Sequence, residues 1–221
     1  MIGATALLLF SGGQDSTTCL YWAKSQFSSV EAVFFHYEQR HRIEYESARK
    51  LAEMEKVHLH ELQVPAFRQI GGSAMIEERR IETGANDLPN TFVPGRNIVF
   101  LGLAGSLAYK RGIHDLVTGV NDADYSGYPD CRSDFIAAMQ ESLSKGLDYP
   151  IHIHAPLQKL DKSGIWALSQ ELGVLEKVVE FSHTCYLGER GTRHPWGYGC
   201  GKCPACLLRK NGYKRFIDKN I

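Results

Sequence analysis

The sequence has no long apolar run, and this absence excludes a membrane-spanning protein. A helix that crosses a bilayer needs about 20 consecutive apolar residues, and no stretch of the 221 residues approaches that length. The apolar residues 2–10 also lack basic residues before them and a small-residue cleavage site after them, so we expect no secretory signal. We therefore predict a cytoplasmic protein with no membrane partner.

The sequence also lacks an excess of either charge. Its 25 basic residues balance 25 acidic ones, so no overall field attracts nucleic acid or an anionic surface. The C-terminal region is locally basic, but a segment this short is more typical of a solvated face, and we expect no nucleic-acid partner. Its basic residues, set against Asp218 alone, are Lys202, Arg209, Lys210, Lys214, Arg215 and Lys219.

Apolar, β-prone runs alternate with helical patterns along most of the chain. We predict strands over residues 4–10, 30–36, 57–64, 114–120 and 151–154, and helices over 16–25, 42–56, 97–110 and from near Asp161. This alternation implies right-handed crossovers and a parallel sheet. The predicted fold class is α/β, with a parallel five-stranded sheet covered by helices on both faces. Residues 65–95 show no clear period, which is typical of a functional or partly disordered loop.

Three polar segments follow predicted strands and are expected to meet. Ligands of parallel sheets bind beyond the carboxyl ends of the strands. Residues 11–18, 36–41 and 121–132 follow the first, second and fourth strands, and they are the least hydrophobic parts of the chain. We therefore predict the binding site at this edge, within a domain that spans residues 1–180.

The stretch LLFSGGQDSTT, residues 8–18, has paired glycines but no lysine. The nucleotide loop G-x-x-x-x-G-K-[ST] carries a lysine for the outer phosphates. Here Gly12 and Gly13 would let the main chain approach an anion, and the following helix would direct its positive end at it. Asp15 would repel bare phosphate, so it suggests either a bridging Mg²⁺ or a helix-capping role. A strand-to-helix turn with no ligand is the alternative.

Four of the six cysteines have the spacing of a metal site. Cys200, Cys203 and Cys206 form a C-x₂-C-x₂-C run, and Cys185 lies upstream. Four thiolates can close a tetrahedral shell around Zn²⁺, which would be structural because no open position remains. A [4Fe–4S] cluster uses similar runs, but no cysteine follows Cys206, which favours zinc. We predict a small zinc-binding region over residues 181–221, with His183 and His194 as alternative ligands.

The pattern strand-S-G-G-x-D-S-helix resembles the signature of the PP-loop ATP pyrophosphatase superfamily. Members hold the β,γ-pyrophosphate of ATP in this loop and cleave between the α and β phosphates, which adenylates an oxygen of their substrate. A loop that holds a departing pyrophosphate does not need the missing lysine. The resemblance implies an adenine nucleotide alpha-hydrolase-like fold and an ATP and Mg²⁺ site at Phe10, Ser11, Gly12, Gly13, Gln14, Asp15, Ser16, Thr17 and Thr18.

Further segments together resemble the 7-cyano-7-deazaguanine synthase family. They are QRH (39–41), PNTFVPGRN (89–97), SGYPDCR (126–132), TCY (184–186) and CGKCPAC (200–206), in that family's order. The resemblance implies that ATP activates 7-carboxy-7-deazaguanine as an acyl-adenylate, that ammonia forms an amide, and that a second activation gives the nitrile precursor of queuosine. It also implies a homodimer. The chain shows no separate glutaminase domain, so we expect free ammonia or a partner as the nitrogen source.

The resemblance also suggests roles for side chains outside the loop. Besides Asp15, the candidate catalytic residues are Arg96 and Arg40, since guanidinium groups pair with phosphate or carboxylate oxygens. A structural ion pair is the alternative for either. Carboxylates and aromatic rings suit a guanine-like ring, which makes the candidate substrate residues Asp124, Tyr125, Tyr128, Asp130 and Arg132. The Tyr-Pro-Asp sequence is also typical of a simple turn.

Two departures from the family leave alternatives open. Residues 121–125 are NDADY, where members usually have Cys-Glu-Thr-Asp-Phe, and the loop between the two halves of the cysteine set is longer. A relative with an altered substrate, or one that stops at the amide, is therefore an alternative. A tRNA thiolase of the same superfamily is another. A zinc-knuckle interaction module with a degenerate nucleotide fold is a third, and it predicts no ATP cleavage.

Overall fold

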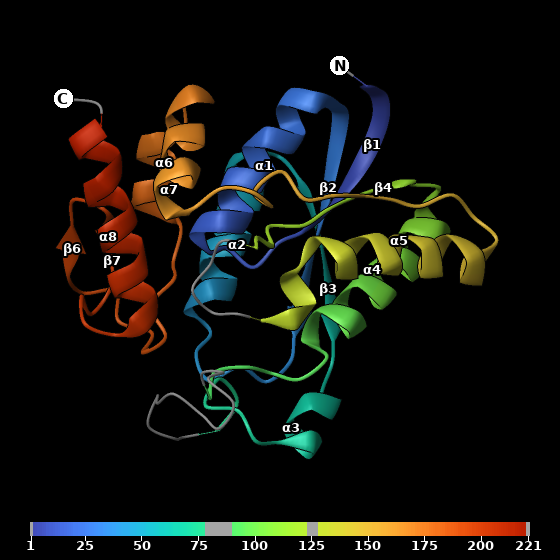
Figure 1. The fold of residues 1–221 in the computed structure, drawn as a ribbon, viewed down its shortest axis with the longest axis horizontal. Coiled ribbons are helices and arrows are strands. Elements are labelled where there is room, and N and C mark those ends of the chain that lie inside the picture. The colour runs from blue at the N-terminus through green and yellow to red at the C-terminus, as the bar shows by residue number, and fades with distance from the viewer. Residues whose placement is uncertain (1, 78–89, 123–127, 220–221) are drawn as a thin grey trace.

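A computed structural model describes residues 2–77, 90–122 and 128–219 (Figure 1). Its main sheet has the strand order β3-β2-β1-β4-β5, and every neighbouring pair is parallel. This confirms the predicted five-stranded parallel sheet. The strands are β1 (Ile2–Leu9), β2 (Phe27–His36), β3 (His58–Gln63), β4 (Asp115–Val117) and β5 (His152–His154).

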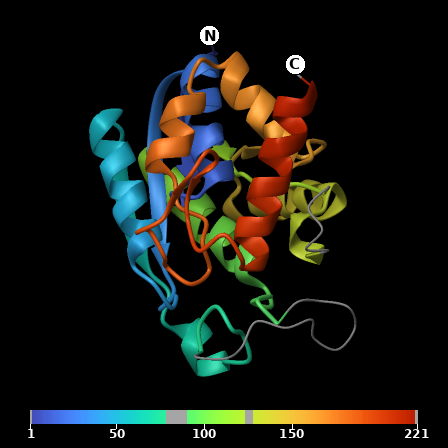
Figure 2. The ribbon, with the colours of Figure 1, turned by 90° about the vertical axis from the view of Figure 1, so that its left-hand side faces the viewer.

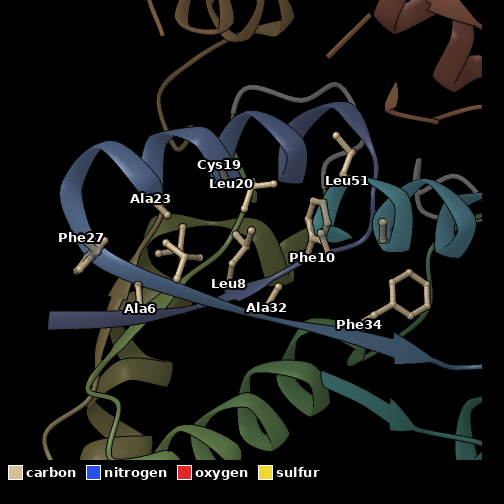
Figure 3. Packing of buried hydrophobic residues seen from close by; sticks show 14 of the residues in the cluster. Ala6, Leu8, Phe10, Cys19, Leu20, Ala23, Phe27, Ala32, Phe34 and Leu51 are labelled. Atoms are coloured by element: carbon tan, nitrogen blue, oxygen red, sulfur yellow. The ribbon is translucent and has the colours of Figure 1, made fainter. Parts of the chain in front are cut away.

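Helices cover both faces of the sheet, as predicted. Helices α1 (Gln14–Gln26) and α2 (Ile43–Met54) pack on one face, and α4 (Arg96–Arg111) and α5 (Ser133–Leu147) cover the other. Alternate side chains of β1 explain this arrangement, because Ala6 and Leu8 belong to one buried cluster and Leu7 to the other. Figure 3 shows the first cluster, where Leu8 and Ala32 lie beneath Leu20 of α1. A strand buried on both faces is apolar throughout.

Residues 162–219, called the C-terminal part below, pack against the sheet through a third apolar cluster. Helices α6 (Lys162–Glu171), α7 (Leu175–Phe181) and α8 (Pro204–Lys219) lie side by side with the short hairpin of β6 (Arg193–His194) and β7 (Gly197–Tyr198) (Figures 1 and 2). Tyr21 of α1, Trp166 of α6 and Phe216 of α8 are buried together there. Gly212 allows α8 to approach α6, because a Cβ at this position would collide with Lys162.

Several boundaries differ from the predictions. The fourth strand ends at Val117, three residues before the predicted end, and residues 118–121 line a cavity, although the N–H of Thr118 still donates to the carbonyl of His154 at 2.9 Å. Helix α3 (Ala66–Ile70) lies within the segment predicted to be irregular, and α5, α7 and α8 occupy regions where we predict no helix. None of the helices formed by the described residues has the length and apolar character needed to cross a membrane.

Candidate active site

A cavity of about 290 Å³ lies at the carboxyl ends of β1, β2 and β4. The three segments that we predict at this edge all contribute to its wall, through Ser11, Tyr37 and Asn121 for example. Residues from the start of α4 and from the C-terminal part complete the wall. These include Arg96, Asn97, Thr184, Tyr186, Ala205, Leu208 and Arg209.

The turn from β1 to α1 is closed by its own hydroxyl groups. The hydroxyl oxygens of Ser11 and Ser16 are 3.0 Å apart, and the main-chain N–H of Gly13 donates to Ser11 Oγ at 3.3 Å. Gly12 has a φ of +77°, and a Cβ there would lie 2.5 Å from the carbonyl oxygen of Glu44. Glycine is therefore required at this position, both for the left-handed backbone and for the close approach of α2. The N-terminal end of α1, whose first N–H groups have no partner within the helix, borders the cavity.

Five of the nine residues of the predicted ATP loop line the cavity. They are Phe10, Ser11, Gln14, Asp15 and Ser16. Thr18 faces the interior, where its hydroxyl donates to the carbonyl of Gln14 at 3.0 Å and lies 2.9 Å from Ser169 Oγ of α6. Thr18 therefore links α1 to α6 through a hydrogen bond, whereas the five residues that line the cavity are placed to contact a ligand.

Gln14 carries an unsatisfied amide at the cavity wall. Its side chain is only 2% exposed, and neither its amide nitrogen nor its amide oxygen has a hydrogen-bond partner among the described residues. The hydroxyl of Thr17, which is fully buried, is also unpaired within this part of the chain. Buried polar groups in folded proteins almost always have partners. The unpaired amide of Gln14 therefore fits a cavity that binds a polar ligand.

A lysine reaches the loop from a distant part of the sequence. Lys162, the first residue of α6, donates from its ammonium group to Asp15 Oδ2 at 2.7 Å, although the two residues are 147 positions apart. Both line the cavity, and Lys162 is 8% exposed. The side chain of the preceding residue, Asp161, accepts from the N–H of Gly164 at 2.8 Å and fixes the start of α6. The loop itself contains no lysine, but the fold places the ammonium group of Lys162 beside it.

Arg96 occupies the cavity wall at the first position of α4. Gly95, in the left-handed conformation with φ of +73°, turns the chain into this helix. Burial alone would lower the pKa of Arg96, but the nearby Tyr37 and Asp130 raise it above its ordinary value. Arg96 therefore remains a cation within the cavity. Arg40, the other candidate arginine, is exposed and does not line the cavity, and its predicted catalytic role stays a prediction.

The predicted substrate residues are not all in one place. Tyr128 lines the cavity, where its hydroxyl lies 2.7 Å from Thr91 Oγ1 and its ring stacks on Phe92. Asp130 is buried behind the wall and accepts from the main-chain N–H of Asn97 at 3.0 Å, so it holds the start of α4 beside Arg96. Arg132 is exposed, at the cap of α5. Asp124 and Tyr125 lie outside the described residues.

Besides Lys162, two further residues of the cavity wall, Glu44 and Tyr186, were missed in the sequence because only the fold brings them to the cavity. Glu44, in the first turn of α2, lines the cavity, and burial raises its pKa to about 7 although Arg96 opposes this shift. Tyr186, which follows Cys185, also lines the cavity, and burial raises its pKa. Glu44 lies three residues after the motif QRH and Tyr186 is the last residue of TCY, but nothing in the sequence spacing links the two residues to each other.

Arg209 corrects the prediction of a solvated basic face at the C-terminus. Its side chain is 1% exposed and donates to the carbonyl of Trp196 at 2.8 Å, to the carbonyl of Val178 at 3.1 Å and to Thr184 Oγ1 at 3.0 Å. Burial lowers the pKa of Arg209 to about 10. This arginine ties α8 to the cavity wall, whereas the other five basic residues of the segment are exposed.

The four predicted cysteine ligands form one cluster. Their Sγ atoms all lie within 4.8 Å of one another, with 3.9 Å between Cys200 and Cys206 and 4.0 Å between Cys185 and Cys203. Four thiolates at 2.3 Å from a single tetrahedral ion would be about 3.8 Å apart, so the donor set fits one such ion. A [4Fe–4S] cluster binds each thiolate through a different iron and needs wider spacing.

Hydrogen bonds within the cluster also suit a cation. Main-chain N–H groups donate to sulfur, from Cys203 to Cys200 Sγ at 3.3 Å and from Cys200 to Cys185 Sγ at 3.5 Å. Hydrogen bonds from Cys203 and Cys206 lower the pKa of Cys185, whereas its neighbours raise the pKa of Cys206. Four thiols this close cannot all ionise without a compensating positive charge. Neither His183 nor His194 belongs to this group: His194 Nε2 pairs with the carbonyl of Gly199 at 2.9 Å, and neither ring nitrogen of the buried His183 has a partner among the described residues.

Comparison with known proteins places the chain in one family. A family model described as "Queuosine biosynthesis protein QueC" matches residues 5–217. Proteins from Nitrobacter hamburgensis and Bordetella avium, both named 7-cyano-7-deazaguanine synthase, are 48% and 50% identical to this chain over 238 and 229 residues. The alignments cover 100% and 97% of this chain and 98% and 93% of those proteins.

Solved structures of lower identity share the fold. A 4-thiouridine synthetase in complex with RNA and bound ATP is 18% identical, with a TM-score of 0.51 over 97% of this chain and 51% of its own. The U34-tRNA thiolase NcsA from Methanococcus maripaludis, with its [4Fe–4S] cluster, is 15% identical, with a TM-score of 0.51 over 98% of this chain and 66% of its own. At these identities the likeness concerns the fold.

Proposed function

The chain belongs to the QueC family of queuosine biosynthesis proteins, and we propose that it is a 7-cyano-7-deazaguanine synthase, which converts 7-carboxy-7-deazaguanine, ammonia and ATP to the nitrile. Relatives of this name match it at about half identity over nearly the full chain. The observation that carries the proposal is the single cavity where the S-G-G-Q-D-S loop, Lys162 and Arg96 meet.

The chemistry explains why one such cavity suffices. A carboxylate is a poor electrophile, so its oxygen first attacks the α-phosphate of ATP, which releases pyrophosphate and forms an acyl-adenylate. Ammonia displaces AMP and gives the amide. The amide oxygen then attacks a second ATP in the same way, and loss of AMP leaves the nitrile. Both activations need the same groups around the phosphates, so one site used twice is enough.

The cavity residues supply binding and charge for these steps. The main-chain N–H groups at the start of α1 and the hydroxyls of Ser11 and Ser16 would hold the pyrophosphate. Lys162 would offset its charge, and Asp15 would hold a Mg²⁺ bound to the phosphates. Arg96 would stabilise the charge that builds on the α-phosphate during attack. Tyr128 offers its ring to the deazaguanine.

We propose that the cysteine cluster holds one Zn²⁺ with a structural role. The spacing of the Sγ atoms supports a single tetrahedral ion with four protein ligands. The cluster is buried in the apolar group that joins α6, α7 and α8. Since Ala205 and Leu208, which flank Cys206, line the cavity, the ion would fix the C-terminal wall of the site.

The remaining proposals concern the surroundings of the protein. We propose a homodimer in the cytoplasm, which follows from the family resemblance and from the absence of long apolar runs in the sequence. Equal numbers of acidic and basic residues support a small-molecule substrate over an RNA.

The test is incubation of the protein with ATP, Mg²⁺, an ammonium salt and 7-carboxy-7-deazaguanine, followed by mass analysis. The proposal predicts the nitrile together with AMP and pyrophosphate, and no product when the ammonium salt is omitted. Accumulation of the amide would instead identify a relative that stops after the first activation. Cleavage of ATP stimulated by tRNA but not by the deazaguanine would favour a thiolase-type enzyme.

A further inference from the structure

The steps above leave one carboxylate in the cavity wall without a role. Glu44 projects from the first turn of α2, is half-buried and lines the cavity. Within the described residues, its carboxylate takes part in no hydrogen bond or ion pair. Asp15, the other carboxylate of the wall, is paired with Lys162, and Asp130 lies behind the wall, bound to Asn97. Glu44 is therefore the carboxylate of this wall that is available to a ligand.

The fold places Glu44 next to the reacting groups. Its main chain touches the loop at Gly12, where a Cβ would lie 2.5 Å from the Glu44 carbonyl oxygen. Arg96 of α4 is close enough for its charge to act on Glu44. Glu44 thus shares the cavity wall with the groups proposed to hold the pyrophosphate and with the group proposed to stabilise the α-phosphate. The carbon atom that ammonia must attack is bonded to this phosphate through one oxygen.

Two aromatic rings share this part of the cavity with Glu44. Tyr37 follows β2, Tyr186 follows α7, and both line the cavity. Burial raises the pKa of the Tyr37 hydroxyl, and the nearby charge of Glu44 raises it further although Arg96 opposes the shift. The Tyr37 phenol therefore stays neutral. Two charged or titratable groups affect the pKa of Glu44: Arg96 lowers it, and Cys185, the residue before Tyr186, raises it.

A carboxylate beside aromatic rings suits a small cation, because a carboxylate pairs with its charge and the ring faces attract it. Ammonium is such a cation, and it is the main form of ammonia in neutral solution. It has no lone pair and cannot attack carbon. A nucleophile therefore forms only when a nearby base removes one proton.

We propose that Glu44, Tyr37 and Tyr186 form a subsite for ammonium and that Glu44 takes a proton from it. This inference rests on the proposed function. Proton transfer converts ammonium and the Glu44 carboxylate to ammonia and a carboxylic acid. The ammonia lone pair forms the C–N bond, the bond from carbon to the phosphate oxygen breaks, and AMP leaves with that electron pair. A second proton leaves the new nitrogen for water, and Glu44 releases its proton before the next cycle.

The environment of Glu44 agrees with this role. A general base is most effective when its pKa is near the working pH. Burial, opposed in part by Arg96, raises the pKa of Glu44 to about 7. At neutral pH the group can both accept a proton and return it.

The test separates activation of the carboxylate from attack by nitrogen. In Glu44→Gln, exchange of pyrophosphate into ATP, driven by 7-carboxy-7-deazaguanine without ammonium, should stay within about two-fold of the unmodified protein. Amide formation from ammonium should fall by about 100-fold or more, the usual contribution of a general base. Hydroxylamine is already uncharged at neutral pH and should still yield the hydroxamate at close to the normal rate. Glu46→Gln, an exposed residue of the same turn, should change neither reaction.

Equal losses with ammonium and hydroxylamine, or loss of pyrophosphate exchange in a folded Glu44→Gln protein, would overturn the subsite. Glu44→Asp keeps the charge and the base, so it should keep exchange and raise the KM for ammonium more than it lowers kcat. An unchanged KM for ammonium in Glu44→Asp would also overturn it, even if the glutamine variant fails to fold. Failure of exchange in the unmodified protein would refute the proposed function itself, a different result.

Discussion

At the scale of single residues, Lys162 and Asp15 form the contact that brings a lysine to the loop proposed to bind phosphate. We expect Lys162→Ala to lower the rate of ATP cleavage by about 100-fold or more, because electrostatic groups placed at a reacting phosphate contribute about this much. Lys159→Ala is the matched control, since Lys159 is exposed and does not line the cavity. AMP release under saturating substrates measures both variants. Equal rates for the two would refute the role of Lys162.

The aspartate of this pair is expected to be indispensable for turnover. Asp15→Ala removes the proposed magnesium ligand and leaves Lys162 without this partner, yet α1 keeps its buried contacts. We predict no detectable AMP release and a circular dichroism spectrum like that of the unmodified protein. Measurable turnover at the normal rate would contradict the assignment.

Glu55 gives the fold a dependence on pH. Burial would raise its pKa, but hydrogen bonds from Lys177, Lys24 and Tyr21 outweigh burial and lower the pKa to about 2. A carboxylate with a lowered pKa stabilises the fold above its unfolded-state pKa, and this contribution is lost as the pH falls toward 2. Glu55→Gln should therefore be less stable than the unmodified protein at pH 7, and the difference should shrink at pH 3. Urea unfolding at both pH values is the measurement.

Single residues also show the limit of sequence reasoning. Ser11, Asp15 and the four cysteines are recognisable because local spacing carries their chemistry. Lys162 and Glu44 are not, because they reach the cavity only when α6 and α2 pack beside the loop. Arg209 was interpreted as a surface residue because it lies in a basic segment of the sequence. In the fold its guanidinium group is buried, because two carbonyls and one hydroxyl accept its hydrogen bonds.

At the scale of elements, the turn between β1 and α1 depends on Gly12. Gly12→Ala would place a Cβ 2.5 Å from the Glu44 carbonyl oxygen and strain a φ of +77°. We expect a loss of about 2–4 kcal/mol in unfolding free energy, from strain and overpacking together. Gly146→Ala in α5 is the control, since nothing lies near its Cβ, and it should stabilise the protein by about 0.5–1 kcal/mol. Urea unfolding should therefore show a lower free energy of unfolding for Gly12→Ala and a higher one for Gly146→Ala.

The elements that could be predicted are those with a strong local pattern. All five strands of the main sheet and helices α1, α2, α4 and α6 follow from apolar runs and helical periodicity. Helix α8 was missed because it begins inside the cysteine run, where glycine, proline and metal-ligand spacing dominate the pattern. Helix α5 was also missed, although Ile136, Leu143 and Leu147 recur at helical spacing and pack toward the core.

At the scale of the whole molecule, the cysteine cluster lies beside residues of the C-terminal part that line the cavity, such as Ala205 and Tyr186. The purified protein should be colourless and contain about one equivalent of zinc. Removal of the ion with a chelator should lower Tm by about 10 °C, which corresponds to about 3 kcal/mol for a chain of this size. ATP cleavage should fall with it, because α8 carries part of the cavity wall. A brown protein that contains iron and sulfide would contradict this.

The parallel topology makes the position of the site predictable before its contents are known. Three polar segments follow three strands, and the sheet order β3-β2-β1-β4-β5 brings them to one cavity. The contribution of the C-terminal part to the same cavity was not predictable, because it depends on how α8 packs against α6 and on the contacts of Arg209.

The central claim is that the protein activates a carboxylate oxygen by adenylation, twice in each catalytic cycle. The most direct measurement uses 7-carboxy-7-deazaguanine labelled with ¹⁸O at both carboxylate oxygens, with mass analysis of every product. Adenylation at both steps predicts unlabelled pyrophosphate, two AMP molecules that each carry one ¹⁸O, and a nitrile that carries none. Label in phosphate or pyrophosphate, or the absence of label from AMP, would contradict the account.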